Sequence, residues 1–204
     1  RMKIIGLSGV AGSGKDLFYD LLASQVPCKR FSLADALKGE ASPYIKEHFG
    51  IDPVSCTRDD KNLIRPALVA HGSLKRKQTN GRYWIEKLQA KMEKFTFEAT
   101  TSGTTPDFLV ITDIRYDEYP KDESIWLKKE MNGILVHISN FSMSGNKQCF
   151  VQPANEEETR ENPKLQQQAD YLVEWEMIKG DLGEIKKTLI RDVIKDFLNW
   201  QKNY

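Results

Sequence analysis

Short apolar runs alternate with longer amphipathic segments along this chain. Four runs, at residues 4–7, 108–111, 134–138 and 171–175, have the length and composition of strands buried in a sheet. A further short strand is expected at residues 28–33. The segments between these runs carry apolar side chains at helical spacing. This order predicts an α/β fold, in which a five-stranded parallel sheet has helices on both faces.

Three helical patterns follow one another in residues 34–95, between the second and third expected strands. The first contains Pro43, at which a break is expected because proline lacks the N–H that a helix interior needs. Thr57 and Asp60 have the spacing of a capping box for the second helix. The third begins at about Arg82. Residues 34–95 are therefore expected to form a helical insertion in the sheet domain.

Two segments remain beyond the fourth expected strand. Residues 182–197 repeat apolar side chains at helical spacing, which predicts an amphipathic helix packed on the sheet. Residues 139–168 are polar and contain Gly145, Pro153 and three consecutive glutamates. A connection of this length between two strands predicts a mobile lid, and a disordered surface loop is the alternative.

The strongest chemical signal is the segment Gly9-Val-Ala-Gly-Ser-Gly-Lys15-Asp16, which joins the first strand to the first helix. In such a loop, glycines allow successive backbone N–H groups to turn inward, and the helix N-terminus adds partial positive charge. A glycine-rich turn that only joins strand to helix would not explain Ser13 and Lys15. The segment therefore predicts a site for the β- and γ-phosphates of a nucleoside triphosphate. The expected nucleotide-binding residues are Gly9, Ala11, Gly12, Ser13, Gly14, Lys15 and Asp16.

Asp16 stands where most such loops carry Ser or Thr as a Mg²⁺ ligand. A carboxylate beside a polyphosphate would repel it unless a cation or a transferring proton lay between them. We therefore expect Asp16 to hold Mg²⁺, directly or through water, or to orient the attacking group. The alternative is an acidic residue in the first turn of a helix, stabilised by the helix dipole by about 0.3–1 kcal/mol.

Phosphoryl transfer requires that donor and acceptor are held in line and that the charge on the moving group is neutralised. Asp113 follows the buried run at residues 108–111, and Arg115 follows two residues later. Since strand ends face the ligand site in an open parallel sheet, Asp113 is a candidate for Mg²⁺ binding and Arg115 for contact with the reacting phosphates. The alternative for Asp113 is a helix cap. The expected catalytic residues are Lys15, Asp16, Asp113 and Arg115.

Basic residues gather in the helical insertion, although the chain as a whole carries a net charge of only +1. An acceptor with a phosphate group needs fixed guanidinium partners, and Arg65 and Arg76 are the candidates. A solvated charged face and a small nucleic-acid patch are the alternatives. The basic residues are Arg58, Lys61, Arg65, Lys75, Arg76, Lys77 and Arg82.

Aromatic residues of the third helical pattern have two interpretations. Tyr83 and Trp84 could stack on a nucleotide base, or could pack in the core with Ile85 and Leu88, and the sequence leaves this open. The three histidines have no mutual spacing that indicates a metal site.

Length and composition limit the classes of protein that remain. The 204 residues suit one α/β domain, and the near balance of 30 basic and 29 acidic residues argues against a protein that wraps nucleic acid. Cys28, Cys56 and Cys149 are widely separated, so neither a zinc site nor a disulfide framework is indicated, and reduced thiols in the cytoplasm are expected. No apolar run approaches the length that spans a bilayer, so no membrane partner is expected. A homodimer is neither required nor excluded.

The chain resembles the deoxynucleoside monophosphate kinases of tailed phages over most of its length. It also resembles animal-type phosphomevalonate kinase, and both groups belong to the adenylate-kinase-like P-loop kinases. The residue sequences around Asp35, Lys38 and Trp84 favour the phage nucleotide kinases. The matching segments are Gly9-Val-Ala-Gly-Ser-Gly-Lys15-Asp16, Phe31-Ser-Leu-Ala-Asp35-Ala-Leu-Lys38, Lys61-x-x-x-Arg65, Arg76, Gly81-Arg-Tyr-Trp84, Thr112-Asp113-Ile-Arg115 and Ala169-Asp170-Tyr-Leu-Val.

The resemblance implies a P-loop NTPase fold that transfers the γ-phosphoryl of ATP, with Mg²⁺, to a (deoxy)nucleoside 5′-monophosphate. It implies a single domain at residues 1–204, with a core at 1–33, 107–139 and 169–204, an acceptor-binding region at 34–95 and a lid at about 140–165. The location implied is the cytoplasm, that of the host if the chain is phage-encoded. A phosphomevalonate or other small-phosphate kinase is the alternative enzyme, and a nucleotide-gated binding module is the alternative without catalysis. The implied acceptor-binding residues are Asp35, Lys38, Lys61, Arg65, Arg76 and Trp84.

The lid departs from the pattern of these kinases. Its basic residues are few, chiefly Lys147, Arg160 and Lys164. The stretch at residues 155–158 matches the lid-end motif of the family only loosely. The roles of lid residues are therefore the part of the resemblance with the least support in the sequence.

Overall fold

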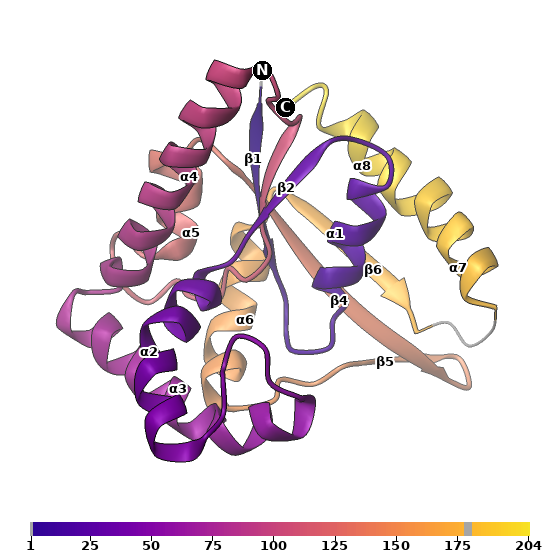
Figure 1. Ribbon diagram of the computed structural model, residues 1–204. Coiled ribbons are helices and arrows are strands. Elements are labelled where there is room, and N and C mark those ends of the chain that lie inside the picture. Colours follow the sequence, from indigo (N-terminus) through magenta and orange to yellow (C-terminus); the bar gives the residue numbers. More distant parts are fainter. Residues whose placement is uncertain (1, 178–180) are drawn as a thin grey trace.

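A mostly parallel sheet forms the centre of the computed structural model, which describes residues 2–177 and 181–204 (Figure 1). Residue 1 and residues 178–180, which fall in the expected core ranges, lie outside the described residues. Five parallel strands run in the order β2-β3-β1-β4-β6, so that β1 lies at the centre between β3 and β4. Their bounds are β1 Lys3–Ser8, β2 Cys28–Phe31, β3 Phe108–Ile111, β4 Ile134–Ser144 and β6 Tyr171–Glu176.

A sixth strand corrects the expectation of a purely parallel sheet. β4 continues to Ser144, well past the expected end at residue 138, and the chain turns at Gly145 into the antiparallel strand β5 (Lys147–Phe150). The chain then enters helix α6 (Glu156–Gln168). The expected lid or disordered loop is thus a hairpin followed by a helix. All four residues of β5 are exposed, so this strand has no apolar alternation by which its sequence could reveal it.

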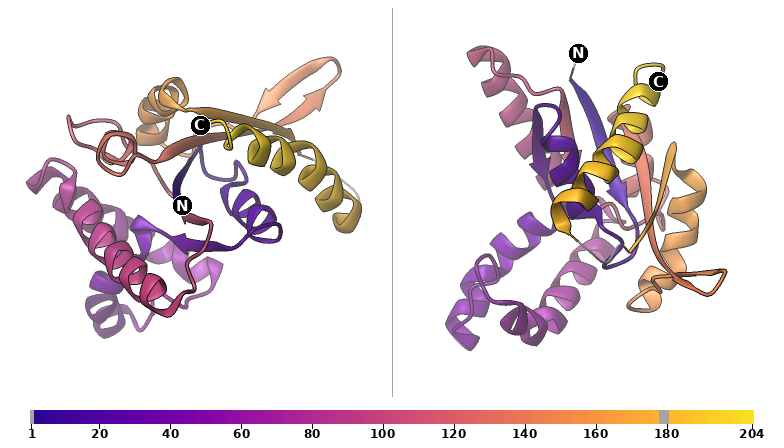
Figure 2. Two further views of the ribbon diagram at one scale, coloured as in Figure 1. Left: turned by 90° about the horizontal axis from the view of Figure 1, so that it is seen from above. Right: turned by 90° about the vertical axis from the view of Figure 1, so that its right-hand side faces the viewer.

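Helices cover both faces of the sheet, as the strand and helix pattern predicted (Figure 2). On one face, Phe18 of α1 (Lys15–Ala23) and Phe197 of α8 (Lys195–Trp200) pack on strand residues such as Val136. The C-terminal helix is continuous from α7 (Leu182–Leu189) through the π-helical turn η2 (Ile190–Ile194) into α8.

The other face is covered by α4 (Arg82–Ser102), by the turn η1 (Trp126–Glu130) and by α6. Here Leu88, Trp126 and Leu165 are almost fully buried. A Cβ atom at Gly6 would lie 2.3 Å from Leu127 Cδ2, so glycine at this position leaves room for the Leu127 side chain of η1 against the central strand. A short helix, α5 (Glu123–Ile125), leads into η1 and was not predicted from the sequence.

The helical insertion consists of α2 (Leu33–Phe49), α3 (Arg58–Gln78) and the first part of α4. The prediction of a break at Pro43 is wrong, because α2 continues through it. Pro43 is exposed, so the carbonyl that loses its helical partner can bond water instead. Thr57 caps α3 as predicted, accepting the Asp60 N–H at 3.2 Å. Within residues 2–177 and 181–204, no helix is long and apolar enough to cross a bilayer.

Candidate active site

The loop between β1 and α1 has the conformation of a phosphate-binding loop. Gly9, Gly12 and Gly14 have φ angles of 135°, 80° and 97°, which side chains of L-residues rarely adopt. A Cβ atom at Gly14 would lie 2.5 Å from the ring of Trp175. The Trp175 Nε1–H in turn donates a hydrogen bond of 2.9 Å to the Ser13 carbonyl. Trp175 of strand β6 therefore packs against the loop at the carboxyl end of the parallel strands and fixes its position.

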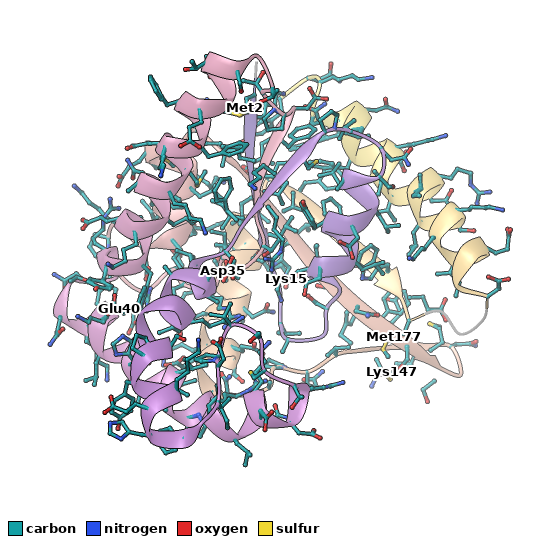
Figure 3. All side chains as sticks on the ribbon, viewed as in Figure 1. Met2, Lys15, Asp35, Glu40, Lys147 and Met177 are labelled. Atoms are coloured by element: carbon teal, nitrogen blue, oxygen red, sulfur yellow. The ribbon has the colours of Figure 1, made fainter. Side chains whose placement is uncertain are left out.

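Lys15, the first residue of α1, turns its side chain back over the loop. Its ammonium donates to the carbonyl oxygens of Gly9 at 2.6 Å and Val10 at 2.9 Å. In Figure 3, Lys15 and Met2 lie toward opposite ends of the sheet. Lys15 is at the end formed by the C-termini of the parallel strands. Burial, with a further contribution from the charge of Arg115, lowers the pKa of Lys15 to about 8. With respect to Lys15, the folded protein therefore becomes more stable as the pH rises from about 8 towards the ordinary lysine pKa of about 10.4.

This pKa predicts that a polyphosphate binds together with a proton. At about pH 8.5, above the Lys15 pKa, neutral Lys15 is populated in the free protein, and phosphate oxygens restore the charged form. We expect a net uptake of protons when the nucleotide binds, measured by calorimetry of ATP binding in buffers with different ionisation enthalpies. The variant Lys15→Arg stays charged at this pH and is expected to take up none. Equal proton uptake by the two proteins would contradict this role of Lys15.

Four buried polar side-chain atoms around the loop have no hydrogen-bond partner among the described residues. They are Ser13 Oγ, His137 Nε2, Asn140 Oδ1 and Asn162 Oδ1. Since buried polar groups are nearly always paired, such a cluster marks a place where a polar ligand or water completes the structure. The amide of Asn140 also lies 3.5 Å from the Gly12 carbonyl, at the edge of the loop. The Ser13 hydroxyl can donate to a phosphate oxygen directly, and each asparagine amide can do so when it is turned over, so these side chains can fit the phosphate groups of a nucleotide.

Glu158 supplies an anion at the same place. Its two carboxylate oxygens accept the Ala11 N–H at 3.2 and 3.3 Å, and Oε2 also accepts the Ala154 N–H at 2.9 Å. Asn155, the N-cap of α6, accepts the Glu158 N–H at 2.9 Å. The N-terminus of α6 therefore brings a carboxylate against the phosphate loop, and an inward-facing N–H of this loop binds negative charge.

A small cavity of about 50 Å³ lies between the phosphate loop, the end of β3 and α6. Its walls include Gly9, Lys15, Arg115, Glu158 and Asn162. The guanidinium of Arg115 is exposed, and no hydrogen bond of this group to another described residue is present. The structure thus brings the predicted residues Lys15 and Arg115 to this one cavity, which is called the chamber below.

Asp113 caps a helix in this structure. Its Oδ2 accepts the Ser32 hydroxyl and the Ala34 N–H, and its Oδ1 accepts the Leu33 N–H, all at 2.8 Å. The carboxylate is buried and satisfies the N-terminus of α2. The geometry therefore favours the helix-cap alternative for Asp113 and gives no support to direct Mg²⁺ ligation by this residue.

Asp16 has the opposite environment. Its side chain is 83% exposed and lies 3.7 Å from Arg30, which also lies 3.9 Å from Asp35. In the described part of the chain, no three His, Cys, Asp or Glu side chains are grouped to hold a metal ion by themselves. Mg²⁺ is commonly bound by one or two carboxylates together with substrate phosphates. Asp16 fits such a shared site, with phosphate oxygens as the other ligands.

Arg76 lies in a buried cluster of charged groups, away from open solvent. Its NH1 and NH2 donate to the two oxygens of Asp122 at 2.9 Å, and NH1 lies 3.3 Å from Glu123 Oε1. The guanidinium also lies over the ring of Tyr116, 3.6 Å from its centroid. Arg76 was predicted to bind the acceptor phosphate opposite Lys15. Because the fork of its guanidinium is already paired, that prediction has no support in the geometry.

This cluster shapes the loop that carries Arg115. Glu123 Oε2 accepts the Arg115 N–H at 2.7 Å and the Tyr116 N–H at 3.2 Å. Burial raises the pKa of Glu123 to about 8, against the opposing charge of Arg76. Burial also acts to raise the pKa of Asp122, but its hydrogen bonds with Arg76 hold that pKa below the ordinary value. Asp122 is therefore the anionic partner of Arg76.

The other predicted acceptor residues are spread over the helical insertion. Lys61 and Arg65 are exposed on α3, and Arg65 bonds Asn62 of its own helix at 3.4 Å. Lys38 is partly buried on α2. Trp84 is 5% exposed and donates to the Gly72 carbonyl at 3.2 Å, so it is a core residue and the base-stacking alternative is not supported. The acceptor roles of Asp35, Lys38, Lys61 and Arg65 stay predictions.

Sequence reasoning missed Glu158 and Asn162 at the phosphate loop. Both lie on α6, in the segment expected to be a lid or a loop. A signal was present in the sequence, because Asn155 followed by Glu158 has the spacing of a capping box. Read as a helix start, it would have placed Glu158 and Asn162 on one helix face, four residues apart.

Comparisons with known proteins assign no family. No protein-family model and no curated protein sequence matched the chain. Among solved structures, the chain is similar to the dephospho-CoA kinase from Campylobacter jejuni, with 12% sequence identity and a TM-score of 0.44. The similarity covers 96% of each chain. At this identity and TM-score, the likeness carries no argument about function. The functional proposal rests on the geometry of the site.

Proposed function

We propose that this protein is a kinase that transfers the γ-phosphoryl group of ATP to a (deoxy)nucleoside 5′-monophosphate. The observation that carries the proposal is the chamber in which the phosphate loop, Lys15 and Arg115 surround a carboxylate that stands where phosphate is expected. Two cationic side chains and inward N–H groups around one small space are suited to a group that gains negative charge as it moves. The products are ADP and the nucleoside diphosphate.

Each residue at the chamber has a separate task in this proposal. The loop at residues 9–14 binds phosphate oxygens through backbone N–H groups, and Lys15 neutralises the β- and γ-phosphates. Arg115 contacts the moving phosphoryl group from the end of β3. Asp16 holds Mg²⁺ with phosphate oxygens, and Mg²⁺ supplies charge neutralisation when bound. Asp113 keeps the N-terminus of α2, and so the acceptor side of the site, in position.

The acceptor side of the proposal rests on Lys38 of α2 and on Lys61 and Arg65 of α3, and Arg65 is its sharpest test. Replacing Arg65 by alanine is expected to raise the KM for the monophosphate about 10-fold or more, because a charge-assisted hydrogen bond is lost. The KM for ATP should change little. Arg58→Ala on the same helix is the matched control. Steady-state kinetics with each substrate varied in turn measure this, and unchanged acceptor kinetics would remove Arg65 from the site.

The experiment that tests the proposed function is a panel of acceptors. ADP formation from Mg-ATP is measured with each ribo- and deoxyribonucleoside monophosphate in turn, and with phosphomevalonate as a parallel acceptor. Turnover with a subset of the nucleotides would support the proposal and define the base and sugar that are accepted. Turnover with phosphomevalonate alone would show that the acceptor is phosphomevalonate and not a nucleotide. Binding of ATP without any acceptor-dependent turnover would contradict the proposal and favour a nucleotide-gated binding module without catalysis.

A further inference from the structure

Helix α6 presents one face to the phosphate loop. Glu158, Asn162 and Leu165 follow one another at helical spacing, so their side chains point in the same direction. Leu165 is 3% exposed and packs in the core beside α4. Glu158 and Asn162 line the cavity that also contains Lys15 and Arg115. The helix is thus anchored by its apolar end, and its polar end faces the site.

The position of α6 is fixed against the loop that carries Arg115. Glu157 accepts the hydroxyl of Tyr116 at 2.8 Å, and Glu161 Oε2 accepts the Asp117 N–H at 3.0 Å. Glu161 is 1% exposed and also pairs with Lys164 on its own helix at 3.0 Å. Both residues that bond this loop precede Asn162 on α6, and Glu161 is its direct neighbour. The backbone of Asn162 is therefore held in a defined place beside Arg115.

The side chain of Asn162 is incomplete within this arrangement. Its Oδ1 is buried, and no described residue hydrogen-bonds to it. A carboxamide carries two N–H donors and one acceptor, and half a turn about its last bond exchanges them. In the orientation described, the unpaired Oδ1 can only accept a hydrogen bond. With the amide turned over, Nδ2 takes its place and can donate to a ligand that offers oxygen atoms.

The terminal phosphoryl group is the part of a nucleotide that this chamber would receive. The lysine of a phosphate loop reaches the β- and γ-phosphates, and the Lys15 ammonium lies over Gly9 and Val10, two residues of the cavity wall. Resting on the proposed function, we propose that Asn162 binds the γ-phosphoryl group, donating an amide N–H to one of its oxygens. The phosphoryl oxygens take the place of the Glu158 carboxylate at the Ala11 N–H.

Binding of two nucleotides that differ only by the terminal group tests this role. The affinities of Mg²⁺-ADP and of its non-hydrolysable β,γ-imido triphosphate analogue are measured by calorimetry for the wild type, Asn162→Leu and Asn162→Asp. Leucine has a similar size and cannot donate a hydrogen bond, and aspartate places a negative charge at the same position. Gln167→Leu is the matched control, since Gln167 is an exposed amide on the same helix.

We expect Asn162→Leu to weaken binding of the triphosphate analogue roughly 10-fold and Asn162→Asp to weaken it more, with little change for ADP. ADP binding also shows that each variant is folded. An equal loss for both nucleotides, or no loss in either, would overturn the role of Asn162 and leave the proposed function standing. Failure of the wild type to bind either nucleotide would overturn the proposed function and this inference together.

Discussion

Replacing Lys15 by methionine is expected to lower kcat for phosphoryl transfer about 10²–10³-fold. The ammonium of Lys15 lies at the wall of the chamber that is proposed to receive the phosphates. Methionine fills similar space but supplies neither charge nor donor. The charge that Lys15 stabilises on the phosphoryl group develops fully only in the transition state. The substitution should therefore lower kcat more than it lowers the affinity for ATP.

Initial rates at saturating ATP and acceptor measure this effect. Lys94→Met is the matched control, because Lys94 lies on the exposed face of α4 with 78% of its side chain accessible. Its activity should equal that of the wild type. Activity of Lys15→Met within a few-fold of the wild type would show that catalysis does not take place at the phosphate loop.

Replacing Arg76 by methionine is expected to lower the free energy of unfolding by about 3–5 kcal/mol, through a different mechanism. The substitution leaves Asp122, which is 0% exposed, without its cation, and it removes the hydrogen bond from Arg76 to Glu123, which is 3% exposed. A buried carboxylate without a partner must stay desolvated or take up a proton, and both are costly. The effect is on stability, since Arg76 does not reach open solvent.

Arg82→Met is the matched control for this prediction. Arg82 forms the same two-pronged pair with Glu130, at 3.0 and 3.1 Å, but Glu130 is 37% exposed. Such a surface pair contributes only about 0–1 kcal/mol. Urea unfolding followed by circular dichroism compares the two variants. Equal losses of stability would contradict the assignment of Arg76 to a buried structural cluster.

The sequence predicted the elements whose signals are local. The runs at residues 108–111 and 134–138 are buried on both sides, so their unbroken apolar character identified them as inner strands. The phosphate loop was identified by glycines at positions that require positive φ, as at Gly14. The hairpin strand β5 was missed, because a strand that is exposed on both sides has no apolar pattern.

The site predictions that the geometry does not support concern contacts between residues far apart in the chain. Arg76 belongs to a basic run and was interpreted as part of a phosphate site, but its partner Asp122 lies 46 residues away. Asp113 has the position expected of a Mg²⁺ ligand, and only the approach of α2 shows it to be a cap. Charge and spacing indicate which chemistry is available, whereas burial and partners decide how it is used.

Transfer of label from [γ-³²P]ATP to a nucleoside monophosphate tests the central claim most directly. The products are separated by chromatography after incubation with Mg²⁺ and each monophosphate in turn. We predict that the label appears in the β-position of a nucleoside diphosphate, in amounts equal to the ADP formed. Label found only in inorganic phosphate, or retained in ATP with every acceptor, would contradict the assignment of this protein as a nucleoside monophosphate kinase.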